Sequence, residues 1–230
     1  RAGDPAPLII YGVTSGISAF TLLRGQLSWM AGQGRRVLLV SSPDEEAVKA
    51  AEREGVGFHA IPMTRRISPM ADLRALAAWV GLLRRARPQA VNASTPKAAL
   101  LGHLAAWLTR VPRRVYVVRG LRVEGSNGLA AGVLWAMEWL TMALASEVVF
   151  VSESLAREAQ RRRLIRPGRG WLVGAGSSNG VNAAAVAARS SQVDASQLRG
   201  GLGFAADDFV VGFVGRVATD KGVDTILRAL

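Results

Sequence analysis

The sequence contains no cysteine and only two histidines, which removes several kinds of chemistry from consideration. Without cysteine the chain has no disulfide framework and no thiolate to act as a nucleophile or metal ligand. His59 and His103 lie far apart, and neither has partners at the spacing of familiar metal sites. We therefore expect both histidines to be structural, and we expect the protein to use no metal and no other cofactor.

Tyrosine and phenylalanine are also few, with 2 and 6 residues, whereas basic residues are abundant. Lysine and arginine number 29 against 17 acidic residues, so the net charge of +12 favours phosphates, nucleic acids or anionic membranes as partners. The aromatic residues do not interleave with the basic ones, and no helix-turn-helix or RNP-like pattern occurs. We expect no nucleic-acid partner.

The sequence also lacks an uninterrupted apolar run long enough to cross roughly 30 Å of hydrocarbon. The most apolar stretch, Gly128 to Ala145, is interrupted by Glu138 and closely followed by Glu147, which predicts a buried or membrane-facing helix. The chain starts on Arg1 without a signal-peptide pattern, and Leu230 falls inside a helical pattern. We therefore expect the 230 residues to be part of a longer protein.

Short apolar runs alternate with amphipathic stretches over most of the chain, which predicts an α/β fold: a Rossmann-like parallel sheet with helices on both faces. The expected strands are 8–11, 36–41, 56–61, 90–93, 114–118, 147–151 and 170–174. Helices are expected at about 20–30, at 44–54, and along a stripe formed by Leu73, Leu76, Ala77, Val80 and Leu83 that should face the core. We assign residues 1–182 to this first domain.

Residues 183–208 are polar and rich in small side chains, which indicates a linker with room for one helix. Residues 209–230 read as a buried strand, Phe209 to Val214, followed by a turn and an amphipathic helix, as at the start of a second Rossmann-like domain. Gly215, Arg216 and Lys221 lie in that turn, where backbone N–H groups and two cations can hold a phosphate. The alternative is the start of any α/β domain with solvated cations.

Two further groups of polar residues follow expected strands, at the edge where open α/β sheets bind ligands. Thr95 and Pro96 suit the start of a helix, and Lys97 then lies in its first turn. A cation there opposes the helix dipole by roughly 0.3–1 kcal/mol, so the side chain either bends into solvent or has an anion beside it. Arg119, Arg122 and Glu124 follow the strand 114–118, although a surface ion pair between Arg122 and Glu124 is an alternative.

Five segments in order resemble family 4 glycosyltransferases of the bacterial capsule and exopolysaccharide type: STPKAALLG, YVVRGLRVE, VSESL, GSSNGVN and GFVGRVATDKG. The resemblance implies a GT-B architecture, in which the N-terminal domain binds the acceptor and a second Rossmann-like domain binds a nucleotide-sugar. It also implies transfer with retention of configuration and without a metal. Many relatives have histidine at the position of Arg119, Asn182 replaces a usual aspartate, and the Glu-x7-Glu motif that holds the donor is absent.

The resemblance also implies roles for individual residues. Arg119 is the expected catalytic residue, close to the transferred group. Gly215, Arg216 and Lys221 are expected to bind the donor diphosphate. The expected acceptor-binding residues are Ser18, at the end of the Gly/Ser-rich loop after the first strand, and Thr95, Lys97, Arg122 and Glu124, while Ser152 and Glu153 are expected elsewhere in the cleft.

The function that follows is transfer of a hexosyl or N-acetylhexosaminyl group from a nucleotide-sugar to a polyprenyl-diphosphate-linked or other saccharide acceptor in cell-surface polysaccharide synthesis. The basic clusters at Arg84 to Arg87, Arg113–Arg114 and Arg161 to Arg163 suit a cytoplasmic enzyme, peripheral on the inner face of the cell membrane, although such clusters are also typical of solvated helix ends. The alternative is a non-catalytic acceptor-binding half that works with a separate donor-binding subunit. We expect the 230 residues alone to transfer no sugar, because the donor-binding glutamates are missing.

Overall fold

The computed structural model describes residues 6–64, 66–123, 128–205, 207–215, 217 and 221–229. The chain divides into two compact units, Arg1–Gly180 and Val181–Leu230. The boundary lies close to the expected end of the first domain at residue 182, while the division of the rest into a linker and a second domain stays a prediction.

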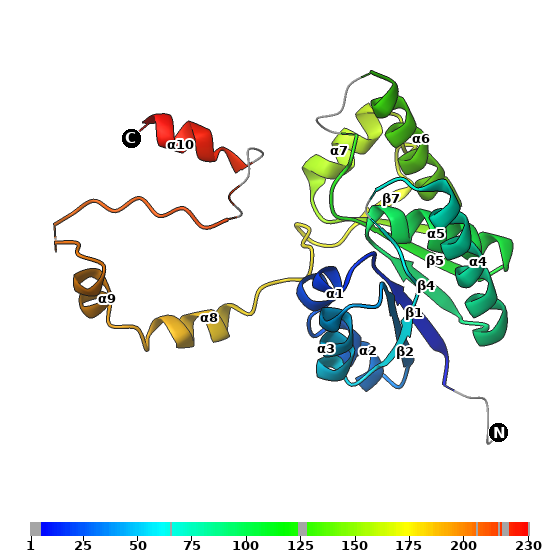
Figure 1. The fold of residues 1–230 in the computed structure, drawn as a ribbon, viewed down its shortest axis with the longest axis horizontal. Coiled ribbons are helices and arrows are strands. Elements are labelled where there is room, and N and C mark those ends of the chain that lie inside the picture. Colours follow the sequence, from blue (N-terminus) through cyan, green and yellow to red (C-terminus); the bar gives the residue numbers. More distant parts are fainter. Residues whose placement is uncertain are drawn as a thin grey trace. The chain divides into compact units, whose positions relative to one another are not determined.

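The first unit is built on a seven-stranded parallel sheet with the order β3-β2-β1-β4-β5-β6-β7 (Figure 1). Its strands are β1 (Leu8–Gly12), β2 (Arg36–Ser41), β3 (Gly57–Ala60), β4 (Ala90–Ala93), β5 (Arg113–Val118), β6 (Glu147–Phe150) and β7 (Gly170–Leu172). The order reverses at β1, where Gly12 pairs with Val40 of β2 on one side and with Ala93 of β4 on the other. This reversal is the topological switch point at which doubly wound sheets bind ligands. The predicted strands and the Rossmann-like sheet are confirmed.

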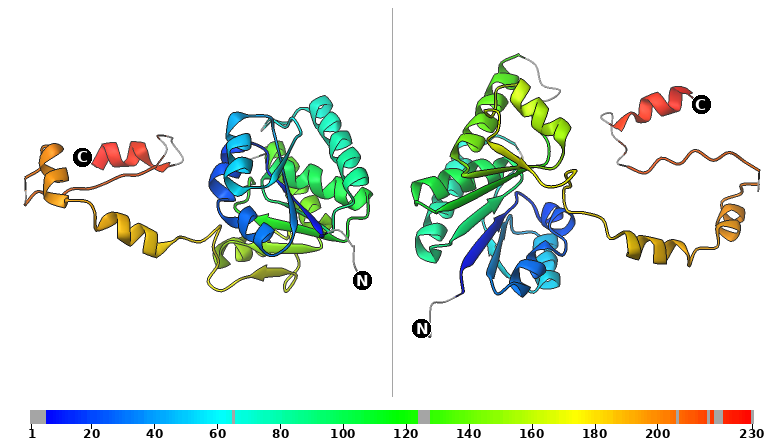
Figure 2. Two further views of the ribbon diagram at one scale, coloured as in Figure 1. Left: turned by 90° about the horizontal axis from the view of Figure 1, so that it is seen from below. Right: turned by 180° about the vertical axis from the view of Figure 1, so that it is seen from behind.

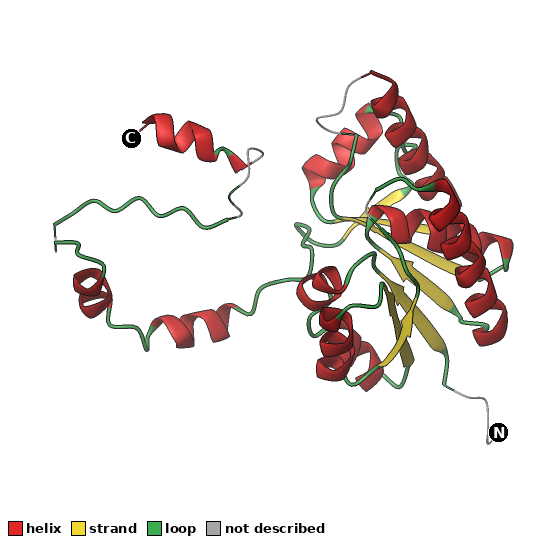
Figure 3. Cartoon of the chain, viewed as in Figure 1, coloured by secondary structure: helices red, strands yellow, loops and turns green. Residues whose placement is uncertain are grey.

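Helices cover both faces of the sheet, as predicted (Figures 2 and 3). They are α1 (Gly16–Leu22), α2 (Gln26–Gly32), α3 (Glu45–Glu54), α4 (Pro69–Ala86), α5 (Pro96–Leu108), α6 (Gly128–Leu144) and α7 (Glu153–Arg161). One core cluster, which includes Leu27 and Leu39, joins α1, α2 and α3 to the sheet. The larger cluster, which includes Trp79 and Met142, joins α4 to α7 to the other face.

The single helix predicted for residues 20–30 is wrong, because two short helices, α1 and α2, replace it. Gly25 lies between them with φ of 74°, a left-handed conformation that glycine adopts without strain and that ends a helix. Carboxylates from the α3 region satisfy the N-termini of both helices. Asp44 accepts from Gly16 N at 2.8 Å, and Glu54 accepts from Gly25 N at 2.9 Å. A Cβ at position 16 would lie 1.7 Å from Asp44 Oδ1, so the contact requires glycine.

The stripe expected to bury α4 is only partly correct. Trp79 and Leu83 are buried, but Leu73 is 61% exposed and Ala77 is also exposed. The helix is rotated so that Ala75, Trp79 and Leu82 face the core. The indole of Trp79 reaches a site where Gly12 leaves room, since a Cβ there would lie 3.0 Å from the ring. The buried face is therefore centred on Trp79 and not on the predicted stripe.

The most apolar helix, α6, packs against α5 and the sheet, which places it as the sequence predicts. Its carboxylate, Glu138, is 4% exposed and accepts a hydrogen bond from the hydroxyl of Tyr116 at 2.9 Å. Within the described residues, the lengths and apolar character of the helices fall short of what a membrane span requires.

The described residues of the second unit form three short helices, α8 (Ala183–Ser190), α9 (Ala195–Gly201) and α10 (Val223–Ala229). The expected helix after Lys221 is present as α10, and the expected linker holds two helices rather than one. Phe209 to Val214, predicted as a buried strand, pairs with no other strand among the described residues, and Phe209 and Val214 are 93% and 101% exposed. A single strand has no neighbours to satisfy its N–H and C=O groups or to cover its faces, so the pattern alone does not bury it.

Candidate functional site

A cavity of about 260 Å³ lies where β1, β4 and β5 end, at the switch point of the sheet. Thr14 follows β1, Thr95 and Lys97 follow β4, and Arg122 follows β5. The lining residues are Thr14, Ser18, Thr95, Pro96, Lys97 and Arg122. Four of the five residues expected to bind the acceptor therefore share one pocket. The fifth, Glu124, lies outside the described residues.

Two threonines join the strand ends behind the pocket. Thr95 Oγ1 accepts from Thr14 N at 2.7 Å and lies 2.8 Å from Thr14 Oγ1. Thr14 Oγ1 in turn accepts from Ala98 N at 3.3 Å, in the first turn of α5. Thr95 is at the N-cap position, as predicted, but its side chain makes no cap hydrogen bond and bonds to Thr14 instead. The start of α5 is thus tied to the end of β1.

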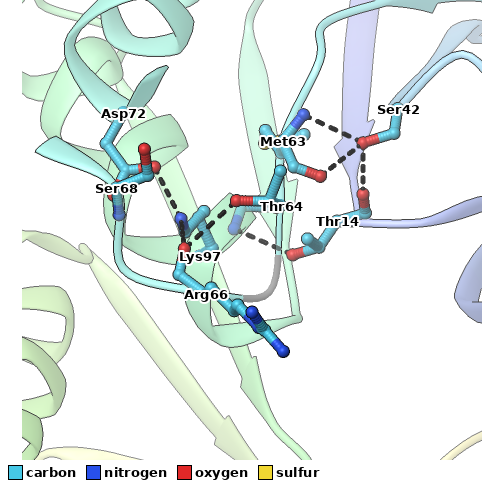
Figure 4. A network of polar contacts seen from close by, with 9 residues as sticks. Thr14, Ser42, Met63, Thr64, Arg66, Ser68, Asp72 and Lys97 are labelled. Carbon is cyan, nitrogen blue, oxygen red and sulfur yellow. Dashed lines mark hydrogen bonds and ion pairs between the residues drawn. The ribbon is translucent and has the colours of Figure 1, made fainter. Parts of the chain in front are cut away.

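Lys97 is buried at the start of α5, with 4% exposure, and it already has an anionic partner. Its Nζ lies 2.6 Å from Asp72 Oδ1 and also donates to the backbone carbonyl of Arg66 (Figure 4). Asp72 Oδ2 accepts from Ser68 N at 3.2 Å, which fixes the carboxylate at the start of α4. These contacts explain how a cation is tolerated in the first turn of α5, so neither exposure to solvent nor a bound external anion is required. An ammonium has three N–H donors, and these contacts occupy two of them.

Ser42 holds the loop between β3 and α4 close to Thr14, at the edge of the pocket (Figure 4). Ser42 Oγ lies 2.8 Å from Thr14 O and 2.7 Å from Met63 O, and it accepts from Met63 N at 2.9 Å. Further along, Thr64 Oγ1 donates to Arg66 O at 3.1 Å, and Arg66 O is the carbonyl that receives Lys97. These bonds hold the pocket wall with backbone atoms as well as side chains.

Arg122 lies in a loop that a buried carboxylate holds in place. Glu138 accepts from the Tyr116 hydroxyl at 2.9 Å and also receives a backbone hydrogen bond from Arg122. Burial raises the pKa of Glu138, while these hydrogen bonds and the charge of Arg122 lower it in part. Burial likewise raises the pKa of Tyr116, together with the neighbouring carboxylate. The pair therefore supports the loop that carries a cation into the pocket.

Arg119, the expected catalytic residue, is not among the described residues that line this pocket. Its Nη1 donates to Ser178 O at 2.6 Å and also contacts the Ser178 hydroxyl, while Asn179 Nδ2 donates to Arg24 O at 2.8 Å. Burial lowers the pKa of Arg119. Within the first unit, the side chain fastens the GSSNG segment to the end of β5, and a role in catalysis stays a prediction.

The remaining predicted residues lie elsewhere. Ser152 Oγ caps α7 by accepting from Leu155 N at 3.2 Å, and Glu153 pairs with Arg157 at 2.7 Å on an exposed helix surface. Gly215 and Lys221 are exposed in the second unit, and Arg216 lies outside the described residues. The structure therefore gives no donor geometry, and that assignment stays a prediction.

Sequence analysis missed Thr14, Ser42, Asp72 and Glu138 as parts of the site. Thr14 could have been found, because it follows β1 as Thr95 follows β4. Asp72 could have been placed at the start of a helix, because the helix dipole favours an acidic residue in the first turn. Nothing in the sequence pairs Asp72 with Lys97, which is 25 residues away.

The pocket combines three hydroxyl groups, an ammonium, a guanidinium and the positive end of α5. Such a set suits an anionic group, with hydroxyls beside it to bind polar parts of the same ligand. Among the described residues, no three histidine, aspartate or glutamate side chains are grouped so as to hold a metal ion. The expectation that no metal or other cofactor is needed stays a prediction.

Comparison with protein families gives a match over residues 17–176 to the glycosyl transferase 4-like domain. The chain belongs to the glycosyl transferase 4-like family. The matched range contains most of the sheet and all pocket-lining residues except Thr14. The resemblance inferred from the five segments is therefore confirmed.

One relative in this family is the capsular polysaccharide biosynthesis glycosyltransferase CapM of Staphylococcus aureus, 32% identical over 220 residues. That alignment covers 96% of this chain and 56% of CapM, so the chain spans about half the length of its curated relative. The backbone of the present chain superimposes on Alr3699/HepE from Anabaena, which was solved with UDP and glucose, with a TM-score of 0.68 at 19% identity. The superposition covers 97% of this chain and 57% of HepE. A glycosyltransferase from Rickettsia africae gives 0.62 at 12% identity, covering 89% and 51%. These likenesses show the Rossmann-like GT-B fold.

Proposed function

We propose that this chain is the acceptor-binding side of a retaining glycosyltransferase of cell-surface polysaccharide synthesis. The donor is a nucleotide-sugar carrying a hexosyl or N-acetylhexosaminyl group, and the acceptor is a polyprenyl-diphosphate-linked saccharide. The reaction takes place without a metal, in the cytoplasm, at the inner face of the cell membrane. CapM, named for capsular polysaccharide biosynthesis, and HepE, solved with UDP and glucose, support this assignment.

The observation that carries the proposal is the gathering of Ser18, Thr95, Lys97 and Arg122 in one pocket. The guanidinium of Arg122, the third N–H of the Lys97 ammonium and the N-terminus of α5 face the negative charge of a diphosphate, and the threonine and serine hydroxyls can bind a sugar or phosphate oxygen. A diphosphate-linked acceptor supplies both kinds of group in a single molecule. Arg119 acts near the transferred group, and Gly215, Arg216 and Lys221 hold the donor diphosphate.

The test is calorimetric binding of a farnesyl-diphosphate-linked monosaccharide to the 230-residue chain. Removing the guanidinium in Arg122→Ala should weaken binding roughly 10- to 100-fold, because hydrogen bonds to charged groups contribute about 1.5–3 kcal/mol. Arg84→Ala, an exposed arginine at the other edge of the sheet, is the matched control. Equal affinities for the two variants, or no binding by the wild type, would contradict the proposal.

A non-catalytic acceptor-binding half that works with a separate donor-binding subunit is the second candidate. It has the same pocket, and it is favoured by the exposure of Gly215 and Lys221 in a unit without paired strands among its described residues. Nucleotide-sugar protection in a thermal shift distinguishes the two. Saturable protection that is lost in Lys221→Ala supports a donor site on this chain, whereas protection only after addition of a second protein supports the alternative.

A further inference from the structure

The outer surface of α6 is apolar along the length of the helix. Leu129, Val133 and Trp139 are 93%, 51% and 46% exposed, and three small residues between them, Ala130, Gly132 and Ala136, are exposed as well. The charged residue of the helix, Glu138, is turned inward to Tyr116. A helix at the surface of a globular protein ordinarily carries polar residues on its outer face. An apolar surface of this kind marks an interaction site.

The exposed indole of Trp139 is held by its neighbours. Its ring stacks on Trp135, with ring centroids 6.3 Å apart and an interplanar angle of 10°. Trp135 is itself fixed, because its Nε1 donates to Arg162 O at 2.8 Å, which joins α6 to the end of α7. Figures 1 and 2 show these two helices side by side. The surface is therefore a formed feature of the folded unit.

Three arginines border the C-terminal half of this apolar surface. A hollow of about 800 Å³ is lined by Trp139 and Ala143 together with Arg163, Arg166 and Arg169, and its lining includes no carboxylate. Arg169 Nη2 donates to Ala145 O at 3.1 Å, so its position beside α6 is fixed. No ion pair involving these three arginines occurs within the described parts of the chain.

The neighbouring arginines differ. Glu158 pairs with Arg161 at 2.6 Å and with Arg162 at 2.5 Å, so both of these cations have a carboxylate partner and share its one negative charge. The three arginines without an ion pair among the described residues therefore lie beside the apolar face of α6. Tryptophan and arginine at the boundary of an apolar surface suit the headgroup region of a bilayer, where the ring is partly buried and the guanidinium binds phosphate.

We propose that the outer face of α6, with Arg163, Arg166 and Arg169, is the surface by which this protein docks on an anionic lipid bilayer. The inference rests on the proposed function in placing the acceptor at a membrane, and it names the surface that binds there. Charge complementarity selects the bilayer as the occupant: the lining has three guanidinium groups and no carboxylate, so a second copy of the same surface offers no opposite charge. The apolar helix beside them does not suit nucleic acid.

The test measures sedimentation of the whole chain with vesicles of phosphatidylcholine alone and with about 30% phosphatidylglycerol. We expect binding only to the anionic vesicles, and weaker binding as salt rises. Replacing the three arginines in R163Q/R166Q/R169Q should reduce the affinity by roughly 100-fold, since each basic residue at an anionic surface contributes about a factor of five. The matched control, R84Q/R85Q/R87Q, removes the same charge from the end of α4 and should reduce it much less.

The apolar part is tested with Trp139→Ala, which should lower vesicle binding and remove most quenching of tryptophan fluorescence by brominated lipid. Trp29→Ala, which removes a 62% exposed indole from α2, should do neither. Circular dichroism and thermal midpoints of all variants establish that they fold. The proposal is overturned if the two arginine triples lose affinity equally, if binding ignores lipid charge, or if Trp139→Ala instead dissolves a dimer seen by analytical ultracentrifugation.

Failure of this proposal is distinguishable from failure of the proposed function. The water-soluble farnesyl-diphosphate-linked monosaccharide reports on the pocket alone, so R163Q/R166Q/R169Q should bind it as the wild type does. Conversely, Arg122→Ala should leave vesicle binding within about two-fold of wild type, because one arginine outside the docking surface is lost.

Discussion

The two edges of the sheet in the first unit carry positive charge in different ways. At the carboxyl edge, Lys97 is buried, paired with Asp72 and tied through the start of α5 to the end of β1. At the amino edge, a hollow of about 880 Å³ contains four arginines and no carboxylate in its lining. These arginines are Arg36, Arg84, Arg87 and Arg110.

The difference shows that abundance of charge does not by itself locate a site. Arg84 and Arg85 lie in the last turn of α4, where a cation is favoured by the negative end of the helix dipole. Their positions are explained by helix stability alone. At the carboxyl edge, hydrogen bonds and an ion pair fix Thr14, Thr95 and Lys97, and that geometry is what a ligand can recognise. Changes at the two edges should therefore have unequal effects.

The largest effect is expected for Lys97→Met. The change leaves Asp72 without its cation and should lower the free energy of unfolding by about 2–4 kcal/mol, somewhat less than for a fully buried pair because Asp72 is 23% exposed. Urea denaturation measures the loss. The double variant Asp72→Asn/Lys97→Met should recover part of the stability, and a cost below about 1 kcal/mol for the single change would contradict the pairing.

A smaller effect, dependent on pH, is expected from His103, which is buried beside Tyr116 with a centroid separation of 5.7 Å. Its pKa is lowered from 6.5 to about 4, chiefly by burial and also by the charge of Arg114, against the opposing effect of hydrogen bonds to the backbone at Ala99 and Val115. The unfolded state then takes up a proton before the folded state does. As pH falls through about 6.5 toward 4, stability decreases, by about 2 kcal/mol between about pH 7 and pH 5.

The control for this titration is His103→Gln, which keeps a donor for Ala99 O but does not titrate. Thermal or urea unfolding at both pH values should show a shallower decline for the variant than for the wild type. Parallel declines would show that acidic groups, and not His103, account for the pH dependence.

The smallest effect belongs to the amino edge. Arg84→Gln/Arg85→Gln should lower the free energy of unfolding by less than about 1 kcal/mol at low salt, and by nothing measurable near 1 M salt, because only the interaction with the helix end is lost. Acceptor affinity should be unchanged. A loss equal to that of Lys97→Met would remove the distinction between the two edges.

The features that depend on local sequence pattern and on parallel strand topology could be predicted from the sequence. Alternating apolar runs predicted the strands, and their carboxyl ends necessarily meet, which brought Ser18, Thr95 and Arg122 to one pocket. Pairings across long sequence separations were not predictable, as Lys97 with Asp72 and Tyr116 with Glu138 show. The break at Gly25 was missed because the periodicity continues across it.

The segment Phe209 to Val214 shows that the burial of a strand depends on its neighbours as well as on its own sequence. Its apolar pattern resembles that of a buried strand, yet the described residues give it no ladder and leave Phe209 93% exposed. Burial of a strand requires neighbours that supply hydrogen bonds and covering side chains, and these are not encoded in the strand itself.

The most direct test of the pocket is amide hydrogen exchange of the chain with and without a saturating farnesyl-diphosphate-linked monosaccharide. The account predicts slower exchange at residues 95–98 and 120–123, around the start of α5 and the Arg122 loop, and no change at residues 84–88 and 109–112 of the amino edge. Slower exchange confined to the amino edge, or no change at the carboxyl edge when the ligand is bound, would contradict the claim that the switch-point pocket binds the acceptor.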